Sequence, residues 1–147
     1  MADVIGILSF ALHAAHKVYD VIQTIKDAPD AVRTLGKEAS RVNGLLTAML
    51  AESNAQSSSL LRHVDHPLVT TLVEDAKELG STAETLLAKV TRQREDGTHE
   101  VKRYRWPFHA GEVEKLSGQF QACYVSLTAV YAVATSYVPT YLTQYPS

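Results

Sequence analysis

The residues that could support catalysis or metal binding are few and lie far apart in this chain. Two histidines and an aspartate occur together in the run His63-Val64-Asp65-His66, and His13 and His16 have a spacing that brings them together on a helix. A structural zinc site needs four ligands of such types, and neither group has further ligands within sequence reach. We therefore interpret the run at 63–66 as a polar turn between helices and the other two histidines as helix-surface residues, rather than as metal ligands.

The single cysteine, Cys123, also lacks the surroundings of a reactive group. It lies in an apolar stretch without a positive neighbour nearby in sequence, so it is expected to be a small core residue rather than a nucleophile. The chain has no glycine-rich phosphate loop and no GxSxG motif. We therefore expect no enzymatic activity, no cofactor and no metal.

Length and composition indicate one folded domain. The chain has 147 residues, of which 46% are hydrophobic and 20% charged, and its net charge is −2. These values favour a globular domain over disorder and give no electrostatic reason for binding nucleic acid. One cysteine fits a reducing compartment, Asp3 stands where a secretory signal would be positive, and the uncharged N-terminal run is too short to span a bilayer. We expect a protein that is cytoplasmic at rest.

The segment around which the chain is organised is the first one, Met1 to Lys26. Its helical spacing places eight apolar residues on one stripe: Val4, Ile7, Leu8, Ala11, Ala15, Val18, Ile22 and Ile25. The opposite face carries Gly6, Ser9, Phe10 and His13, and no charged residue occurs from Val4 to His16. A helix that faces water normally has charged residues there, so this uncharged face is unusual.

The remaining pattern predicts three further long helices. They are expected at 29–51, at 67–94 and from about 107 to 137, where Pro139 would end the last one. In the second of the four helices the inward stripe is Val32, Leu35, Ala39, Val42, Leu46, Met49 and Leu50, with Arg33, Lys37, Glu38 and Arg41 on or near the wet side. In the third we expect these residues to face inward: Leu68, Leu72, Ala76, Leu79, Ala83, Leu86 and Val90. In the last the stripe is Val113, Leu116, Phe120, Cys123, Tyr124, Leu127, Tyr131, Ala134 and Val138. A short helical turn could begin at Leu60-Leu61, residues 95–98 form a turn, and no strand pattern is visible. The predicted fold is all-α, an antiparallel bundle of four long helices over residues 1–138, with a tail or linker at 139–147.

The last helix is unusual because it has no charged residue after Lys115. A helix that is apolar nearly all round is central in its domain, covered by another copy, or in a membrane. Central burial and a homodimer face are favoured over a membrane span because several Gln, Ser and Thr residues interrupt the apolar stretch. The candidate homodimer face consists of Tyr124, Val125, Ala129, Val130, Val133 and Tyr137.

A cluster of basic residues lies between the third and fourth helices. It consists of Arg92, Arg94, Lys102, Arg103 and Arg105, followed by Trp106, with acidic residues interleaved. Because the acids nearly cancel its field, the cluster is a solvated loop or, alternatively, a contact with the headgroups of an anionic membrane. Trp106 either packs over the end of the bundle or inserts at that interface.

These features together resemble a known family. The opening MADVIGILSFALHAAHKVYDVIQTIKDAP, the spacing DAPDAVRTLGKEASRVNGLLTAML and the segment YRWPFHAGEVEKLSGQFQACYVSLTAV are similar to the HeLo-like N-terminal domains of fungal NOD-like (STAND) receptors. That group is related in architecture to the four-helix bundle of mixed lineage kinase domain-like protein. The resemblance covers about residues 1–138, and it implies a regulated cell-death domain that oligomerises and releases its N-terminal helix towards the plasma membrane. The small-residue spacing of that helix is partial here, because Phe10 interrupts Ala2, Gly6 and Ala14.

Two hypotheses follow. In the first, the chain is a membrane-targeting cell-death domain of a fungal innate-immunity or incompatibility system, activated by oligomerisation at the plasma membrane and dimeric at rest. Its effector surface would be Val4, Ile5, Gly6, Ile7, Leu8, Phe10, Leu12 and His13. In the second, it is a helical homodimerisation module that brings receptor domains together. The uncharged face of the first helix favours the first hypothesis.

Overall fold

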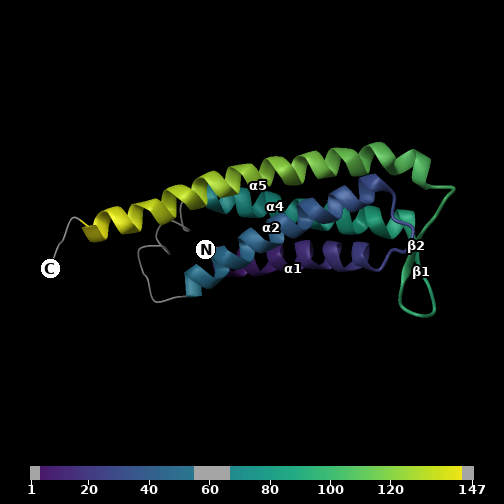
Figure 1. The fold of residues 1–147 in the computed structure, drawn as a ribbon, viewed down its shortest axis with the longest axis horizontal. Coiled ribbons are helices and arrows are strands. Elements are labelled where there is room, and N and C mark those ends of the chain that lie inside the picture. Colours follow the sequence, from purple (N-terminus) through teal and green to yellow (C-terminus); the bar gives the residue numbers. More distant parts are fainter. Residues whose placement is uncertain (1–3, 55–66, 144–147) are drawn as a thin grey trace.

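The computed structural model describes residues 4–54 and 67–143, with side chains described for 6–51 and 68–132. Its elements, labelled as in Figure 1, are α1 (Val4–Gln23), α2 (Asp30–Asn54), α4 (Pro67–Val90), β1 (Thr91–Gln93), β2 (His99–Val101) and α5 (Trp106–Thr143). The fold is an all-α bundle of long helices, as predicted, with one small two-stranded sheet.

The helices pack in a four-membered ring. Helix α1 packs against α2 and α4, and α5 packs against the same two, so α1 lies diagonally across the bundle from α5. Successive helices run in opposite directions along the long axis (Figure 1). Among the described residues, the largest fully buried side chains of the core between them include Phe120, Leu8, Leu35, Leu46, Met49, Leu87 and Leu127.

The inward stripes predicted for the four helices are confirmed over the described residues, except at the start of α4. Leu68 was expected to face inward, but it is 52% exposed, and Val69 and Val73 are buried instead. The other residues of the predicted α4 stripe are buried or packed against the core. In α2, Glu38 was placed at or near the wet side but is buried.

Two predicted boundaries were wrong. The third helix ends at Val90 rather than Arg94, and Thr91–Gln93 pairs with His99–Val101 as an antiparallel hairpin. A three-residue strand is too short to show an alternating pattern, although the turn at 95–98 is present and contains Gly97 at φ 87°. The last helix continues through Pro139 to Thr143, because a proline removes one helical hydrogen bond without necessarily ending the helix.

Some predictions fall outside the described residues. They concern the helical turn at 60–61, the run at 63–66, residues 144–147 of the expected tail, and the side chains of Val4, Ile5, Val133 and Tyr137. The expected tail from residue 139 begins inside α5.

Candidate functional site

The outer face of α1 carries the exposed uncharged surface that the sequence predicted. Phe10 is 66% exposed, and Ser9 and His13 are exposed beside it. Of the other predicted effector residues, Gly6, Ile7 and Leu12 are half-buried, whereas Leu8 is fully buried and belongs to the core of the resting fold. The face is not free of charge, because the Lys77 ammonium of α4 lies 5.6 Å from the centre of the Phe10 ring, a cation–π contact.

Helix α1 is held closely by α4. A Cβ atom at Gly80 of α4 would lie 2.6 Å from Ala14 Cβ, so the two backbones are in near contact there. One turn further along α1, the Lys17 ammonium pairs with the Glu84 carboxylate of α4 at 2.7 Å. Any departure of α1 from the bundle must break these contacts.

The hairpin holds the C-terminal end of α1. The His99 amide donates to the Thr24 carbonyl at 3.0 Å, and the Lys26 amide donates to the His99 carbonyl at 3.4 Å. The Thr24 hydroxyl, which has one proton, donates to the Val21 carbonyl at 2.7 Å. It therefore accepts from the His99 ring through Nδ1–H, at 2.6 Å. Strand β2 is thus hydrogen-bonded to the C-terminal end of α1. We call the contacts of His99 with Thr24 and Lys26 the clasp; His99 and Thr24 are 75 positions apart in the sequence.

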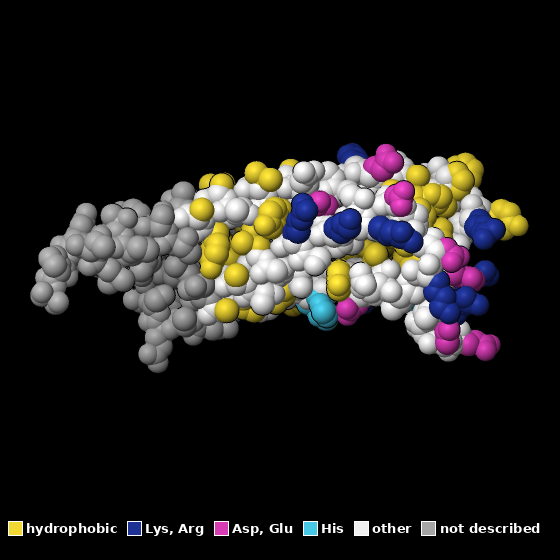
Figure 2. All heavy atoms as spheres, viewed as in Figure 1, with side chains coloured by type: hydrophobic (Ala, Val, Ile, Leu, Met, Phe, Trp, Pro, Cys, Tyr) yellow, Lys and Arg dark blue, Asp and Glu magenta, His cyan; other side chains and the backbone are white. Residues whose placement is uncertain are grey.

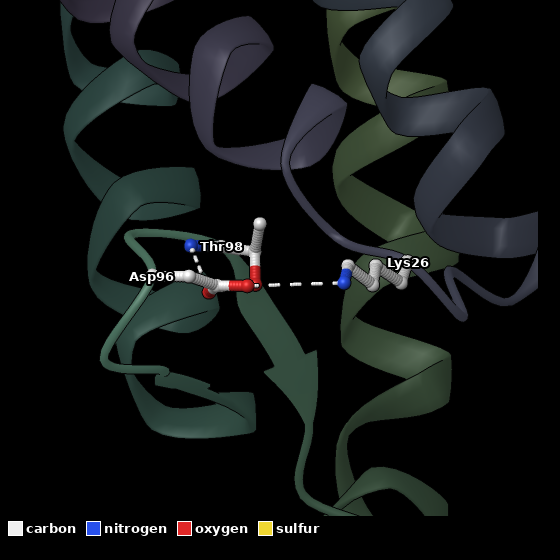
Figure 3. Close-up of polar contacts among 3 residues, drawn as sticks. All are labelled: Lys26, Asp96 and Thr98. Carbon is white, nitrogen blue, oxygen red and sulfur yellow. Dashed lines mark hydrogen bonds and ion pairs between the residues drawn. The ribbon is translucent and has the colours of Figure 1, made fainter.

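The hairpin turn is itself ordered around one carboxylate (Figure 3). Asp96 Oδ1 accepts from the Thr98 hydroxyl at 2.6 Å and from the Thr98 amide at 3.0 Å, while Oδ2 lies 3.8 Å from the Lys26 ammonium. These hydrogen bonds, with the charges of Lys26 and Arg94, hold the pKa of Asp96 below its usual value. The carboxylate is therefore ionised at neutral pH and links the turn to the segment that follows α1.

Replacing His99 with alanine should loosen the end of α1. The variant loses the ring contact to Thr24, and a net hydrogen bond of about 1 kcal/mol corresponds to roughly fivefold faster opening. We expect hydrogen exchange at the Ile25 and Lys26 amides to accelerate by that factor. Gln93→Ala is the matched control, because Gln93 lies opposite His99 in the hairpin register and is exposed. Equal acceleration in both variants would contradict the clasp.

The basic cluster is placed at the hairpin end of the bundle, where cations and anions are mixed (Figure 2). Arg92 pairs with Glu100 at 2.6 Å, Arg94, Arg103 and Arg105 are exposed, and Lys102 is half-buried. Trp106 is half-buried and packs on the core, which confirms the packing alternative for this residue.

Two aromatic residues beside this cluster are far more exposed than Trp106. Tyr104 is 92% exposed and Phe108 is 81% exposed. Tyr104 was missed by the sequence reasoning, although the run RYRWPF alternates arginine with aromatic residues and could have indicated it. We call Arg103, Tyr104, Arg105 and Phe108 the aromatic-basic corner.

Helix α5 has one buried side and one exposed side over its described side chains, so the central position considered for it was wrong. Of the candidate homodimer face, Val125 is 61% exposed, Ala129 is exposed, and Tyr124 and Val130 are half-buried against the core. Because Val125 and Ala129 are exposed on the part of α5 that has no charged residue, a dimer contact there is a proposal to test.

A groove of about 890 Å³ separates α4 from α5 and contains Cys123 in its wall. The thiol is buried and lies 3.8 Å from the Leu72 carbonyl, to which it donates. Burial, with a smaller effect of the Asp75 charge, raises the pKa of Cys123 to about 11. The thiol is therefore protonated at neutral pH and is a poor nucleophile there.

The described residues contain no group of three or more His, Cys, Asp or Glu residues arranged to hold a metal ion. His13 is exposed, and His16 lies 3.1 Å from the Asp20 carboxylate on the same helix. Among the described residues, none of the helices combines the length and apolar character that crossing a membrane requires.

By its fold, the protein is an all-α helical bundle whose first helix is hydrogen-bonded at its C-terminal end to the hairpin. Comparisons of the chain with protein-family models, with curated proteins and with solved structures found no match.

Proposed function

We propose that this chain is a membrane-permeabilising cell-death domain whose effector is α1 and which acts after self-association. The observation that carries the proposal is the outer face of α1, where Phe10 is 66% exposed on a helix without a charged residue of its own from Val4 to His16. The resemblance to HeLo-like domains supports the same function.

A released α1 would be apolar on most of its circumference. Its inner face would expose the side chains that fill the resting core, Leu8, Ala11, Ala15 and Val18, in addition to Phe10 on the outer face. Twenty residues give about 30 Å of helix. Because α1 lacks the apolar character of a membrane span, we propose that it does not cross the bilayer but inserts its uncharged N-terminal part, residues 4–16, into the acyl region, so that the outer face also contacts lipid.

The aromatic-basic corner would supply a second membrane contact. Arginines near an anionic leaflet contribute about 1 kcal/mol each, and tyrosine rings accumulate at the membrane–water interface. The corner lies at the same end of the bundle as the clasp on α1 (Figure 1). Contact there would hold the C-terminal end of α1 at the membrane while its N-terminal end moves out.

Glutamates on the outer face of α1 test this proposal. In Ser9→Glu/His13→Glu both substitutions are at exposed positions, so the bundle should fold normally. Each charge costs about 2.5 kcal/mol or more at the bilayer centre and less at its surface. We expect dye release from anionic liposomes to fall to the buffer level, whereas Ala88→Glu, at an exposed site on α4, should release dye like the unmodified protein. Normal release by a well-folded double variant would exclude α1 as the effector.

A second function is favoured by one observation. Val125 is 61% exposed on a helix with no charge after Lys115, which suits a non-enzymatic homodimerisation module. In that case Val125→Glu would abolish a dimer measured by light scattering, and neither protein would release dye.

A further inference from the structure

A row of basic side chains runs along the outer face of α2. Arg33, Lys37 and Arg41 recur every four residues and are exposed, so they span about 12 Å of helix. A row of Lys and Arg side chains crosses the middle of the face seen in Figure 2. All three residues line a groove of about 550 Å³ between α1 and α2, and none of the described residues that line it is acidic. We call these three residues the basic row.

The basic row is only partly compensated within the protein. Arg41 pairs with Glu38 at 3.3 Å, yet the Arg41 side chain remains 56% exposed and the Glu38 side chain 11% exposed. A guanidinium has five N–H donors, so one such contact leaves others available. Arg33 and Lys37 form no ion pair among the side chains that the structure describes.

Helix α4 carries the opposite charge on its own outer face. Glu74, Asp75 and Glu78 are exposed, and none of them forms an ion pair with a described side chain. Two other charged residues of α4 are directed to α1, because Lys77, between Asp75 and Glu78, lies over the Phe10 ring and Glu84 pairs with Lys17. We call these three carboxylates the acidic row.

The two rows lie on opposite sides of the molecule. Helices α2 and α4 each pack against α1 and α5, so they occupy diagonal corners of the bundle. A two-fold dimer formed through either row would place like charges against each other. Both rows of one copy can instead meet opposite charges only if each contacts a different neighbour, which is a head-to-tail arrangement.

We propose that the basic row of one copy docks on the acidic row of the next, so that the protein assembles head to tail into a ring or an open filament. This inference deepens the proposed function, on which it rests for the role of self-association, and it names the partner as a second copy of this chain. Exposed ion pairs add little affinity individually but orient partners. Assembly should therefore depend on salt and on local concentration, and the resting protein should disperse when dilute.

Charge reversal tests the arrangement with matched variants. The first variant is Arg33→Glu/Lys37→Glu, which leaves the Arg41–Glu38 pair intact, and the second is Glu74→Lys/Glu78→Lys. At about 0.05 M salt, where the Debye length exceeds 10 Å, the unmodified protein should form concentration-dependent species larger than a dimer in sedimentation velocity. Each variant alone should need at least about tenfold more protein to assemble, since like charges now face each other.

An equimolar mixture of the two variants gives the decisive result. The acidified α2 face of the first variant meets the basic α4 face of the second, and the two unaltered rows also meet, so assembly should return to the level of the unmodified protein. Three results would each overturn the proposal: a mixture that stays monomeric, variants that assemble normally, or an unmodified protein that is a strict monomer or a closed dimer.

Loss of liposome binding by Arg33→Glu/Lys37→Glu with unchanged assembly would assign the basic row to lipid instead. Assembly is measured without membranes, so an assembled protein that releases no dye would contradict only the proposed function.

Discussion

Replacing Gly80 with alanine is expected to destabilise the bundle by about 1 to 3 kcal/mol, the usual cost of overpacking a core. The new Cβ atom would lie 2.6 Å from Ala14 Cβ and 3.3 Å from the Ala14 carbonyl carbon. A flexible side chain could move away from such a contact, but a helix backbone cannot do so without shifting α1 as a whole. The expected loss is therefore opposite in sign to the gain of about 0.5 to 1 kcal/mol that alanine normally brings inside a helix.

Urea unfolding of matched variants measures this effect. Gly118→Ala is the control, because a Cβ atom at Gly118 of α5 would meet nothing within 4 Å, and it should stabilise the protein. Gly36→Ala is intermediate, since its Cβ atom would lie 2.9 Å from Ile22 Cγ2, a side-chain methyl group rather than backbone. If Gly80→Ala stabilised the protein as much as Gly118→Ala, α1 and α4 would not pack as closely as described.

The sequence was sufficient to predict the helical bundle because each long helix has a clear apolar period. Core residues such as Val18, Val42 and Phe120 were predicted from that period alone and are fully buried. The burial of Val69 in place of Leu68 at the start of α4 was not predictable in this way. Leu68 and Val69 are both apolar, so the apolar period alone does not decide which of them faces inward.

The candidate site was predictable only where it depends on one helix. The exposure of Phe10 and His13 followed from the pattern of α1 itself. The clasp of His99 on Thr24 joins residues 75 positions apart, and no local pattern indicates such a contact. The two charged rows were similarly visible only as separate solvated faces, because their diagonal placement depends on how the four helices surround the core.

A reversible cross-link between α1 and α4 should switch the proposed activity off and on. Lys17 and Glu84 are within 2.7 Å of each other and exposed enough to modify, so cysteines at both positions can be joined by a bismaleimide that contains a disulfide. The native Cys123 is buried with a pKa raised to about 11, so it should not react under these conditions. Cysteines at Arg92 and Glu100, which pair within the hairpin at 2.6 Å, give a control cross-link that does not involve α1.

Dye release from anionic liposomes by these cross-linked proteins tests most directly whether α1 must leave the bundle. The protein cross-linked between residues 17 and 84 should release no more dye than buffer, and reduction of the linker should restore release to that of the same variant before cross-linking. The protein cross-linked within the hairpin should release dye throughout. Full release by the protein that is still cross-linked between residues 17 and 84 would show that membrane activity does not require α1 to separate from α4, and would contradict the account.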